Sequence, residues 1–245
     1  MTQSIIITGA SSGIGRATAN LFLRAGWQVG LLARRKDKLD DLARGHDNAH
    51  VLVADVTDPV ALEAAVSDFV GITSRLDVLF NNAGMFGPTR TIDEIGLEEW
   101  QQVLNLNLSG MFYSARLAFR QMRHQAPQGG RIINNGSLSA HSPRPGSVCY
   151  TTTKHAISGL TRTLSLDGRA FDIACGQIDI GNARTELVDD LNARVLAENP
   201  DAELMPMMDV KEAAKSVFHM ASLPLSANVQ FMTVLATKMP FVGRG

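Results

Sequence analysis

A tyrosine and a lysine four residues apart, Tyr150 and Lys154, are the pair in this sequence best suited to proton transfer. Residues with this spacing lie on one face of a helix, one turn apart. A lysine ammonium near a phenol favours the phenolate, which would lower the tyrosine pKa from about 10 toward neutrality. Ser137, thirteen residues upstream, could hydrogen-bond the same substrate oxygen. Because this spacing also occurs in ordinary solvated helices, the rest of the chain must decide its meaning.

The elements that must position these side chains alternate between short apolar strands and helices. Strands are expected at residues 4–8, 28–33, 50–54, 76–80, 131–135, 172–180 and 228–233. Helices are expected at residues 14–25, 37–42, 59–69, 97–122 and 210–221, with a further helix around Tyr150. This alternation predicts βαβ units and a parallel sheet covered on both faces. No linker or repeat interrupts it, so we expect one α/β domain over residues 1–245, with a doubly wound sheet of about seven strands.

Composition excludes several classes of function. The chain has 245 residues, of which 45% are apolar and 19% charged, and its formal net charge is -1. This balance argues against a nucleic-acid partner or an anionic membrane surface. There is no apolar run of 18 residues, and no signal peptide or metal site is predicted. Two cysteines, Cys149 and Cys175, are too few for a disulfide framework, so we expect a cytoplasmic protein.

A glycine-rich stretch at residues 8–15, Thr-Gly-Ala-Ser-Ser-Gly-Ile-Gly, lies between the first predicted strand and the first predicted helix. Glycines let a backbone approach a pyrophosphate, and a helix N-terminus presents unpaired N–H groups to it. The strand–turn–helix context turns a weak pattern into strong evidence for a Rossmann-type dinucleotide site. The contacts expected here come from Gly9, Ser11, Ser12, Gly13, Ile14 and Gly15.

The end of the second strand indicates which dinucleotide is bound. NAD enzymes usually carry an acidic residue there, whereas this chain has Arg34 and Arg35. Guanidinium groups suit a 2′-phosphate, so NADP is preferred. The alternatives are that both arginines are simply solvated and that NAD is the cofactor. Asp55 and Val56 follow the third strand and are expected near the adenine, although Asp55 could equally form a turn.

Asn107 interrupts the apolar face of the long predicted helix, which includes Trp100, Val103 and Met111. A buried amide without partners costs on the order of 1–3 kcal/mol. It therefore either ties down a neighbouring backbone or serves the chemistry. Residues 186–208, which mix acidic side chains with methionines, are expected to form two surface helices or a mobile substrate lid.

Together these motifs resemble the short-chain dehydrogenase/reductase family. The resemblance runs from Ile5 to about Thr185, and its motifs are the 8–15 loop, Asn81-Asn82-Ala83-Gly84, Asn107-Leu-Ser-Gly110, Ser137 and Tyr150-x-x-x-Lys154. It implies an NADP(H)-dependent oxidoreductase that interconverts an alcohol and a ketone or aldehyde. An NAD-dependent enzyme is one alternative. A non-catalytic dinucleotide sensor or scaffold is another, but it would be expected to have lost its serine, tyrosine or lysine.

The resemblance also implies roles for single residues. Tyr150 would be the general acid and base, Ser137 would bind the substrate oxygen with it, and Lys154 would bind the nicotinamide ribose. Asn107 would hold a water that relays protons to the lysine. Asn81, with Ala83 and Gly84 beside it, would steady the sheet and border the adenosine side. Gly181 and Thr185 would contact the nicotinamide amide and the phosphates.

The substrate pocket is less defined by the sequence. We expect it to be formed by Leu138, His141 and Arg144, by Cys149, and by residues 186–208. His141 and Arg144 could meet an anionic group, although solvated loop residues are the favoured alternative. The methionines hint at an apolar ligand, and a sterol, a sugar, an acyl thioester and a small ketone all stay open.

Two departures from the family pattern bear on the loops and the assembly. Ile180 stands where the family usually has proline, which puts the rigidity of that loop in doubt. The usual acidic-Gly-Gly ending is missing from the tail at residues 236–245. In the family that tail commonly lies near a subunit interface, and the resemblance implies a homo-oligomer, either a dimer or a tetramer.

Overall fold

Seven parallel strands form the centre of the fold in the computed structural model, which describes residues 2–202 and 204–242. Their order in that part of the chain is β3-β2-β1-β4-β5-β6-β7, and each neighbouring pair is parallel. The strands are β1 (Ser4–Thr8), β2 (Gln28–Ala33), β3 (Ala49–Val53), β4 (Val78–Asn81), β5 (Gly130–Asn135), β6 (Ile173–Gly181) and β7 (Phe231–Leu235). The predicted doubly wound α/β fold is confirmed.

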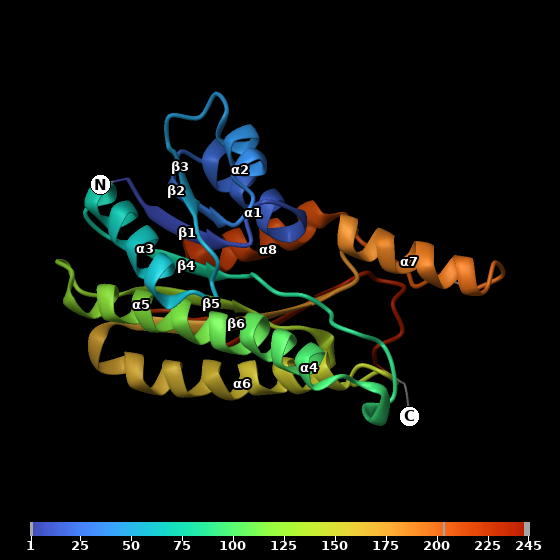
Figure 1. Cartoon of the computed structure of the whole chain (residues 1–245). Coiled ribbons are helices and arrows are strands. Elements are labelled where there is room, and N and C mark those ends of the chain that lie inside the picture. The colour runs from blue at the N-terminus through green and yellow to red at the C-terminus, as the bar shows by residue number, and fades with distance from the viewer. Residues whose placement is uncertain (1, 203, 243–245) are drawn as a thin grey trace.

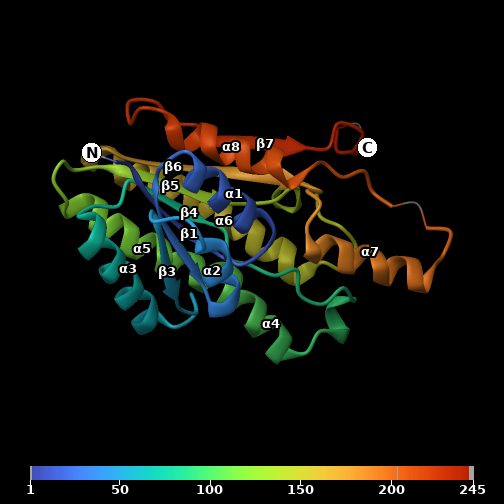
Figure 2. The ribbon, with the colours of Figure 1, turned by 90° about the horizontal axis from the view of Figure 1, so that it is seen from above.

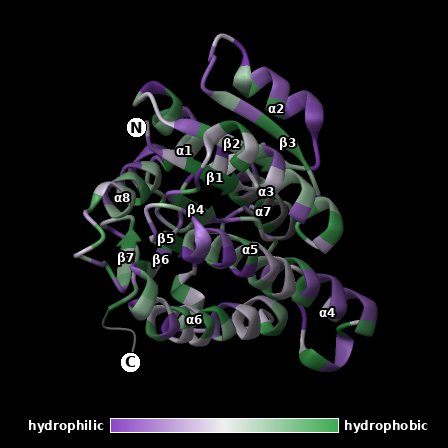
Figure 3. Cartoon of the chain, turned by 90° about the vertical axis from the view of Figure 1, so that its left-hand side faces the viewer, coloured by the Kyte–Doolittle hydropathy of each residue, from purple (hydrophilic) through white to green (hydrophobic). Residues whose placement is uncertain are grey.

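Helices cover both faces of this sheet (Figures 1 and 3). One face carries α1 (Gly13–Arg24), α2 (Lys36–Ala43) and α8 (Val210–Ser222). The other carries α3 (Pro59–Thr73), α4 (Leu97–Leu104), α5 (Gly110–His124) and α6 (Val148–Gly168). Short 3-10 turns are η1 (Ile92–Glu94), η3 (Leu138–Ala140) and η4 (Arg169–Phe171). Among the residues that the structure describes, no helix is both long and apolar enough to span a bilayer.

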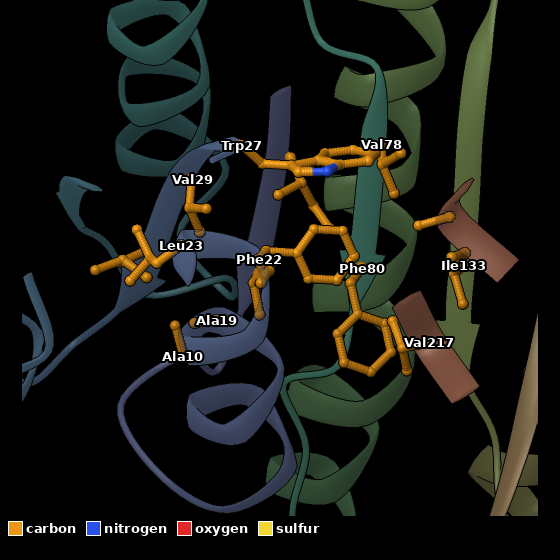
Figure 4. Close-up of a cluster of buried hydrophobic side chains, with 14 of the residues drawn as sticks. Ala10, Ala19, Phe22, Leu23, Trp27, Val29, Val78, Phe80, Ile133 and Val217 are labelled. Atoms are coloured by element: carbon orange, nitrogen blue, oxygen red, sulfur yellow. The ribbon is translucent and has the colours of Figure 1, made fainter. Parts of the chain in front are cut away.

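The core explains why β1 is apolar throughout. All five of its residues are buried, because helices lie on both sides of it. On the α1 side, Phe22 packs edge-on against Trp27, with ring centroids 4.9 Å apart. Figure 4 shows these two rings beside Phe80 of β4 and Val217 of α8. Aromatic packing of this kind fixes α1 and α8 against the sheet, which in turn fixes the loop before α1.

Two strands begin two or three residues later than the sequence predicts, and side-chain contacts explain both. Leu76 uses its backbone N–H and C=O to bind the side-chain amide of Gln125 at 2.9 Å each, so it is taken out of the ladder and β4 starts at Val78. Before β7, the guanidinium of buried Arg131 donates to four oxygens of residues 223–228. That loop is therefore folded around Arg131, and the strand follows it.

The long helix predicted at residues 97–122 is interrupted. Between α4 and α5 lies a π-helical turn, η2 (Asn105–Ser109), which contains Asn107. Turns of this type widen a helix by one residue and often occur at functional sites. The helical axis continues from α4 to α5, so the prediction of one long element holds apart from this turn.

The segment at residues 186–208 contains one helix, whereas one of the two predictions for it was a pair of surface helices. This helix, α7 (Glu186–Glu198), extends beyond the end of the sheet (Figure 2). The chain then returns without further helix in the described residues, and Glu203 lies outside them. Met208 pairs with the backbone of residues 182–184 through two hydrogen bonds of 2.9 Å. The segment therefore leaves the sheet and rejoins it at the same place.

Candidate active site

Tyr150 and Lys154 lie in the first two turns of α6 and meet Ser137 at the carboxyl end of the sheet. Ser137 follows β5 and is 7% exposed, and Lys154 is 4% exposed. The Lys154 Nζ atom donates a hydrogen bond of 2.7 Å to the carbonyl oxygen of Asn135. It also lies 5.4 Å from the centroid of the Tyr150 ring. The structure thus brings together the three side chains that the sequence predicted to work together.

Burial dominates the charge states of this pair. Burial raises the pKa of Tyr150. The hydrogen bond from Ser137 and the charge of Arg144 lower this pKa, but their effect is smaller. Burial also lowers the pKa of Lys154 to about 8, against the opposing charge of Asp179. The prediction that Lys154 brings the tyrosine pKa down toward neutrality is therefore wrong for this environment. With a pKa of about 8, Lys154 is still mainly cationic at neutral pH.

Asn107 is 1% exposed and ties two elements together. Its Oδ1 accepts a hydrogen bond from the N–H of Met85, and its Nδ2 donates to the carbonyl oxygen of Met85, each at 2.8 Å. Nδ2 also lies 3.3 Å from Thr153 Oγ1, which donates to the carbonyl of Tyr150. These contacts therefore show directly that the Asn107 amide ties down a neighbouring backbone, which was one of its two predicted roles. They link the loop after β4 to the tyrosine helix.

The glycine-rich loop has the conformation that a pyrophosphate requires. Gly9 and Gly13 have φ angles of +69° and +53°, in the region that favours glycine. The N-cap residue of α1, Ser12, makes no side-chain capping bond, and the first turn of α1 has no acidic residue. The amides there stay available for an anion. A side chain at Gly15 would meet the backbone of Gly9, so Gly15 serves close packing.

A cavity of about 600 Å³ runs from this loop to the tyrosine helix. It is lined by most of the predicted site residues, namely Gly9, Ser11, Ser12, Gly13, Ile14, Arg34, Arg35, Asp55, Val56, Ala83, Gly84, Ser137, Tyr150, Lys154, Gly181 and Thr185. The predicted residues Gly15, Asn81 and Asn107 are not on this lining. The glycine conformations, the uncapped helix and the continuous cavity fit a dinucleotide.

Asn81 faces away from the cavity, contrary to the prediction that it borders the cofactor. It is 1% exposed, and its Nδ2 donates to the carbonyl oxygen of Met111 at 2.7 Å. The next residue, Asn82, lines the cavity instead. It receives a hydrogen bond from Asn135 and donates one to the carbonyl of Thr8. Asn81 keeps only the sheet-steadying part of its predicted role.

The two arginines after β2 occupy different places. Arg35 Nη2 lies 3.0 Å from both Ser11 Oγ and Ser12 Oγ. Arg34 is largely exposed, and its Nη1 is 3.5 Å from Asp55 Oδ2. The other oxygen of Asp55 accepts hydrogen bonds from the N–H and hydroxyl of Thr57, so the predicted alternative of a turn is observed. Arg35 and the two serines form a polar cluster beside the phosphate loop.

Many apolar side chains line the other end of the cavity, together with polar residues such as Ser142, Glu186 and Asn192. It is lined by Met85, Phe86, Leu138, Pro143, Leu204, Met205, Met207, Met239, Pro240 and Phe241, with Arg144 as a cationic residue. His141 and Cys149, which were predicted to line the pocket, do not. Cys149 is fully buried, and His141 turns toward Asp179. Ile180 continues β6 and pairs with Val234 of β7. A proline at this position would have no backbone N–H to offer to the strand.

Several residues of this site were missed by the sequence reasoning. Phe86 packs edge-on against Tyr150, with ring centroids 5.1 Å apart, and the tail at residues 239–241 lines the cavity. No local pattern marks either of these. Asp179 did carry a signal, because a charged residue inside a predicted buried strand needs partners.

Comparisons with known proteins agree with this geometry. The short chain dehydrogenase family profile matches residues 3–196. An uncharacterised oxidoreductase of Staphylococcus saprophyticus is 33% identical over 201 residues, which cover 80% of each chain. A 3-ketoacyl-(acyl-carrier-protein) reductase from Brucella melitensis, solved with NADH, has a TM-score of 0.85 at 22% identity, covering 95% of this chain and 96% of its own. A serine dehydrogenase complexed with NADP+ has a TM-score of 0.85 at 23% identity, covering 95% and 94%.

Proposed function

Because the chain belongs to the short-chain dehydrogenase family, we propose that it is an NADP(H)-dependent oxidoreductase that interconverts an alcohol and a ketone or aldehyde. Enzymes of this family act on alcohol and carbonyl groups with NAD(P). The observation that carries the proposal is a single cavity with a phosphate-type loop at one end and Ser137 with Tyr150 at the other.

The cofactor would be held by the residues that already line the cavity. The backbone of Gly9 and Gly13 and the N-terminus of α1 would face the pyrophosphate. Thr185 lies beside this loop, since a side chain built on Gly13 would come within 3.3 Å of its methyl group. Lys154 would bind the nicotinamide ribose hydroxyls. When bound, the nicotinamide supplies or accepts the hydride.

The proton chemistry belongs to the chain itself. In the direction of reduction, Ser137 would hydrogen-bond the substrate oxygen, and Tyr150 would give that oxygen a proton. The raised pKa of Tyr150 keeps its phenol protonated at neutral pH, as a proton donor requires. Lys154 would place a positive charge behind the ring of Tyr150 as the proton leaves. Asn107 would connect Lys154 to a proton relay, in addition to holding the Met85 loop.

Preference for NADP is supported by the charge around the ribose end of the cavity. Arg34 and Arg35 both line it, and Arg35 lies within 3.0 Å of the hydroxyls of Ser11 and Ser12. A 2′-phosphate placed there would gain charge-assisted hydrogen bonds from the guanidinium. NAD is the alternative, since solved relatives contain one cofactor or the other.

A cytoplasmic location and a homo-oligomeric assembly stay predictions. For the assembly, one exposed large apolar side chain on each of two helices of the same layer is relevant. They are Phe112 of α5, 47% exposed, and Leu166 of α6, 57% exposed. Sedimentation of the purified chain would distinguish a dimer or tetramer from a monomer.

The test of the proposed function is the Tyr150→Phe variant, assayed for NADPH oxidation with a panel of ketones and aldehydes. We expect turnover to fall at least about a hundredfold, because the proton donor is lost. NADPH binding, followed by quenching of protein fluorescence, should be retained. Tyr113→Phe is the matched control and should keep its activity. Undiminished turnover in Tyr150→Phe would refute the assignment.

A further inference from the structure

A buried carboxylate, Asp179 of β6, lies directly behind Ser137. It is 0% exposed. Its Oδ1 accepts hydrogen bonds of 2.8 Å from the N–H of Ser137 and from Gln177 Nε2. Its Oδ2 lies 2.8 Å from His141 Nε2. Burying a charge is costly unless it is paired and hydrogen-bonded, and here each oxygen has a donor.

The backbone before Ser137 is shaped around this carboxylate. A side chain built on Gly136 would collide with Asp179 Oδ1 and would come within 2.5 Å of Gln177 Nε2. Only glycine lets the chain pass so close to the carboxyl group. The turn that presents Ser137 to the cavity is therefore fitted to Asp179 through both a hydrogen bond and a steric limit.

The charge of Asp179 also reaches the tyrosine and the lysine. It raises the pKa of Tyr150 in addition to the larger effect of burial, and it raises the pKa of Lys154 against the effect of burial. The other charged or titratable groups that face this region are His141, which binds Asp179 directly, and Arg144, whose charge acts on Tyr150 in the opposite sense. Asp179 thus partly opposes the effect of burial on a lysine that is almost fully buried.

We propose that Asp179 is a positioning residue of this active site, which holds Ser137 through its amide and whose buried negative charge acts on Tyr150 and Lys154. This rests on the proposed function, in which those three side chains do the chemistry. His141 is the solvent-facing partner of this carboxylate, with a side chain 43% exposed.

The first test measures the phenol itself and needs no substrate. Tyr113 and Tyr150 are the two tyrosines of the sequence, so Tyr113→Phe leaves Tyr150 as the sole phenol. Its ionisation is followed by phenolate absorbance across an alkaline titration, with circular dichroism recorded at each pH to confirm the fold. In Asp179→Asn, which keeps the size and the acceptor oxygen, the midpoint should move to lower pH. A midpoint that is unchanged or higher would overturn the proposal.

The second test is the pH profile of NADPH-dependent carbonyl reduction. In Asp179→Asn the alkaline limb of the profile, where activity falls as pH rises, should shift to lower pH. Both Tyr150 and Lys154 would deprotonate more easily without the negative charge. His141→Gln retains the carboxylate, so its alkaline limb should stay in place. A uniform loss of activity with no shift of that limb would mean that Asp179 has only a structural role, and the proposal would fail.

These outcomes are separable from failure of the proposed function. If the unmodified protein turns over no substrate, the phenol titration still decides whether Asp179 acts on Tyr150. If Tyr150→Phe is inactive but both titration and profile are unmoved by Asp179→Asn, only the inference about Asp179 is lost. Should Asp179→Asn not fold, Asp179→Ser, which keeps an acceptor oxygen without the charge, takes its place in both experiments.

Discussion

Lys154 donates its hydrogen bond to the carbonyl oxygen of Asn135, at the end of β5, over a distance of 2.7 Å. The bond attaches the second turn of α6 to the sheet and fixes the ammonium behind Tyr150. It satisfies one of the three donors of a lysine. Lys154 is only 4% exposed, so its ammonium has lost most of its hydration. This single hydrogen bond does not compensate for that loss, and the pKa of Lys154 is lowered.

The buried lysine predicts a rise in stability with pH. The pKa of Lys154 is about 8 in the fold and 10.5 for an ordinary lysine. Between those values the unfolded chain binds more protons, so the free energy of unfolding increases as pH rises. From about pH 8 to about pH 10 the gain should be about 2 kcal/mol. Urea unfolding at several pH values measures it.

Lys154→Met is the control for that measurement, because the other titrating groups are unchanged in it. The difference between the two proteins isolates the lysine. If both gain or lose the same stability over this range, the pKa of Lys154 is not depressed by burial, and the charge balance described for the site is wrong.

The arginines after β2 predict a change of cofactor preference. Arg35→Ala should weaken NADPH binding about tenfold or more while leaving NADH binding nearly unchanged, because only NADPH offers a 2′-phosphate to the guanidinium. Arg34→Ala should have a smaller effect, since the Arg34 side chain is 72% exposed and pairs with Asp55 rather than with the phosphate loop. Titration of both variants with both cofactors is the measurement. Equal losses for NADPH and NADH would contradict the assignment.

Local patterns were sufficient for the fold. Apolar strands alternating with helices predict a parallel sheet covered on both faces, and the structure has this sheet. Strand ends were harder to place, because they depend on distant side chains. Gln125 removes Leu76 from the ladder, and Arg131 organises the loop before β7. Neither partner is near in sequence, so no window along the chain contains the signal.

The site was predictable where its residues sit in a fixed motif. Ser137, Tyr150 and Lys154 are brought together as expected, whereas the direction of the Tyr150 pKa was not foreseen. That direction depends on how deeply α6 is buried and on Asp179, which reaches the site from another strand. The choice between Asn81 and Asn82 likewise depends on which face each side chain takes at the end of β4.

The hydrogen bonds of Asn107 predict that replacing this residue lowers the stability of the fold, an effect that can be measured apart from catalytic activity. Asn107→Leu leaves the N–H and C=O of Met85 without their partner, which should cost about 1–3 kcal/mol. Asn107→Asp still accepts from the N–H but can no longer donate to the carbonyl, and it buries a charge, so its cost should be at least as large. Thermal unfolding ranks the three proteins. If Asn107→Leu is as stable as the unmodified chain, the amide does not hold the Met85 loop.

The close contact between Gly136 and Asp179 predicts that adding one methyl group at residue 136 can displace the turn that presents Ser137. In Gly136→Ala the new carbon would overlap Asp179 Oδ1, so either the carboxylate or the turn must move, at a cost of about 1–3 kcal/mol. Gly159→Ala, on the exposed side of α6 with open space around it, should instead stabilise the protein by about 0.5–1 kcal/mol. Both effects are read from chemical unfolding, and turnover should fall only in Gly136→Ala. If Gly136→Ala matches Gly159→Ala in both measurements, the carboxylate does not shape the turn that presents Ser137.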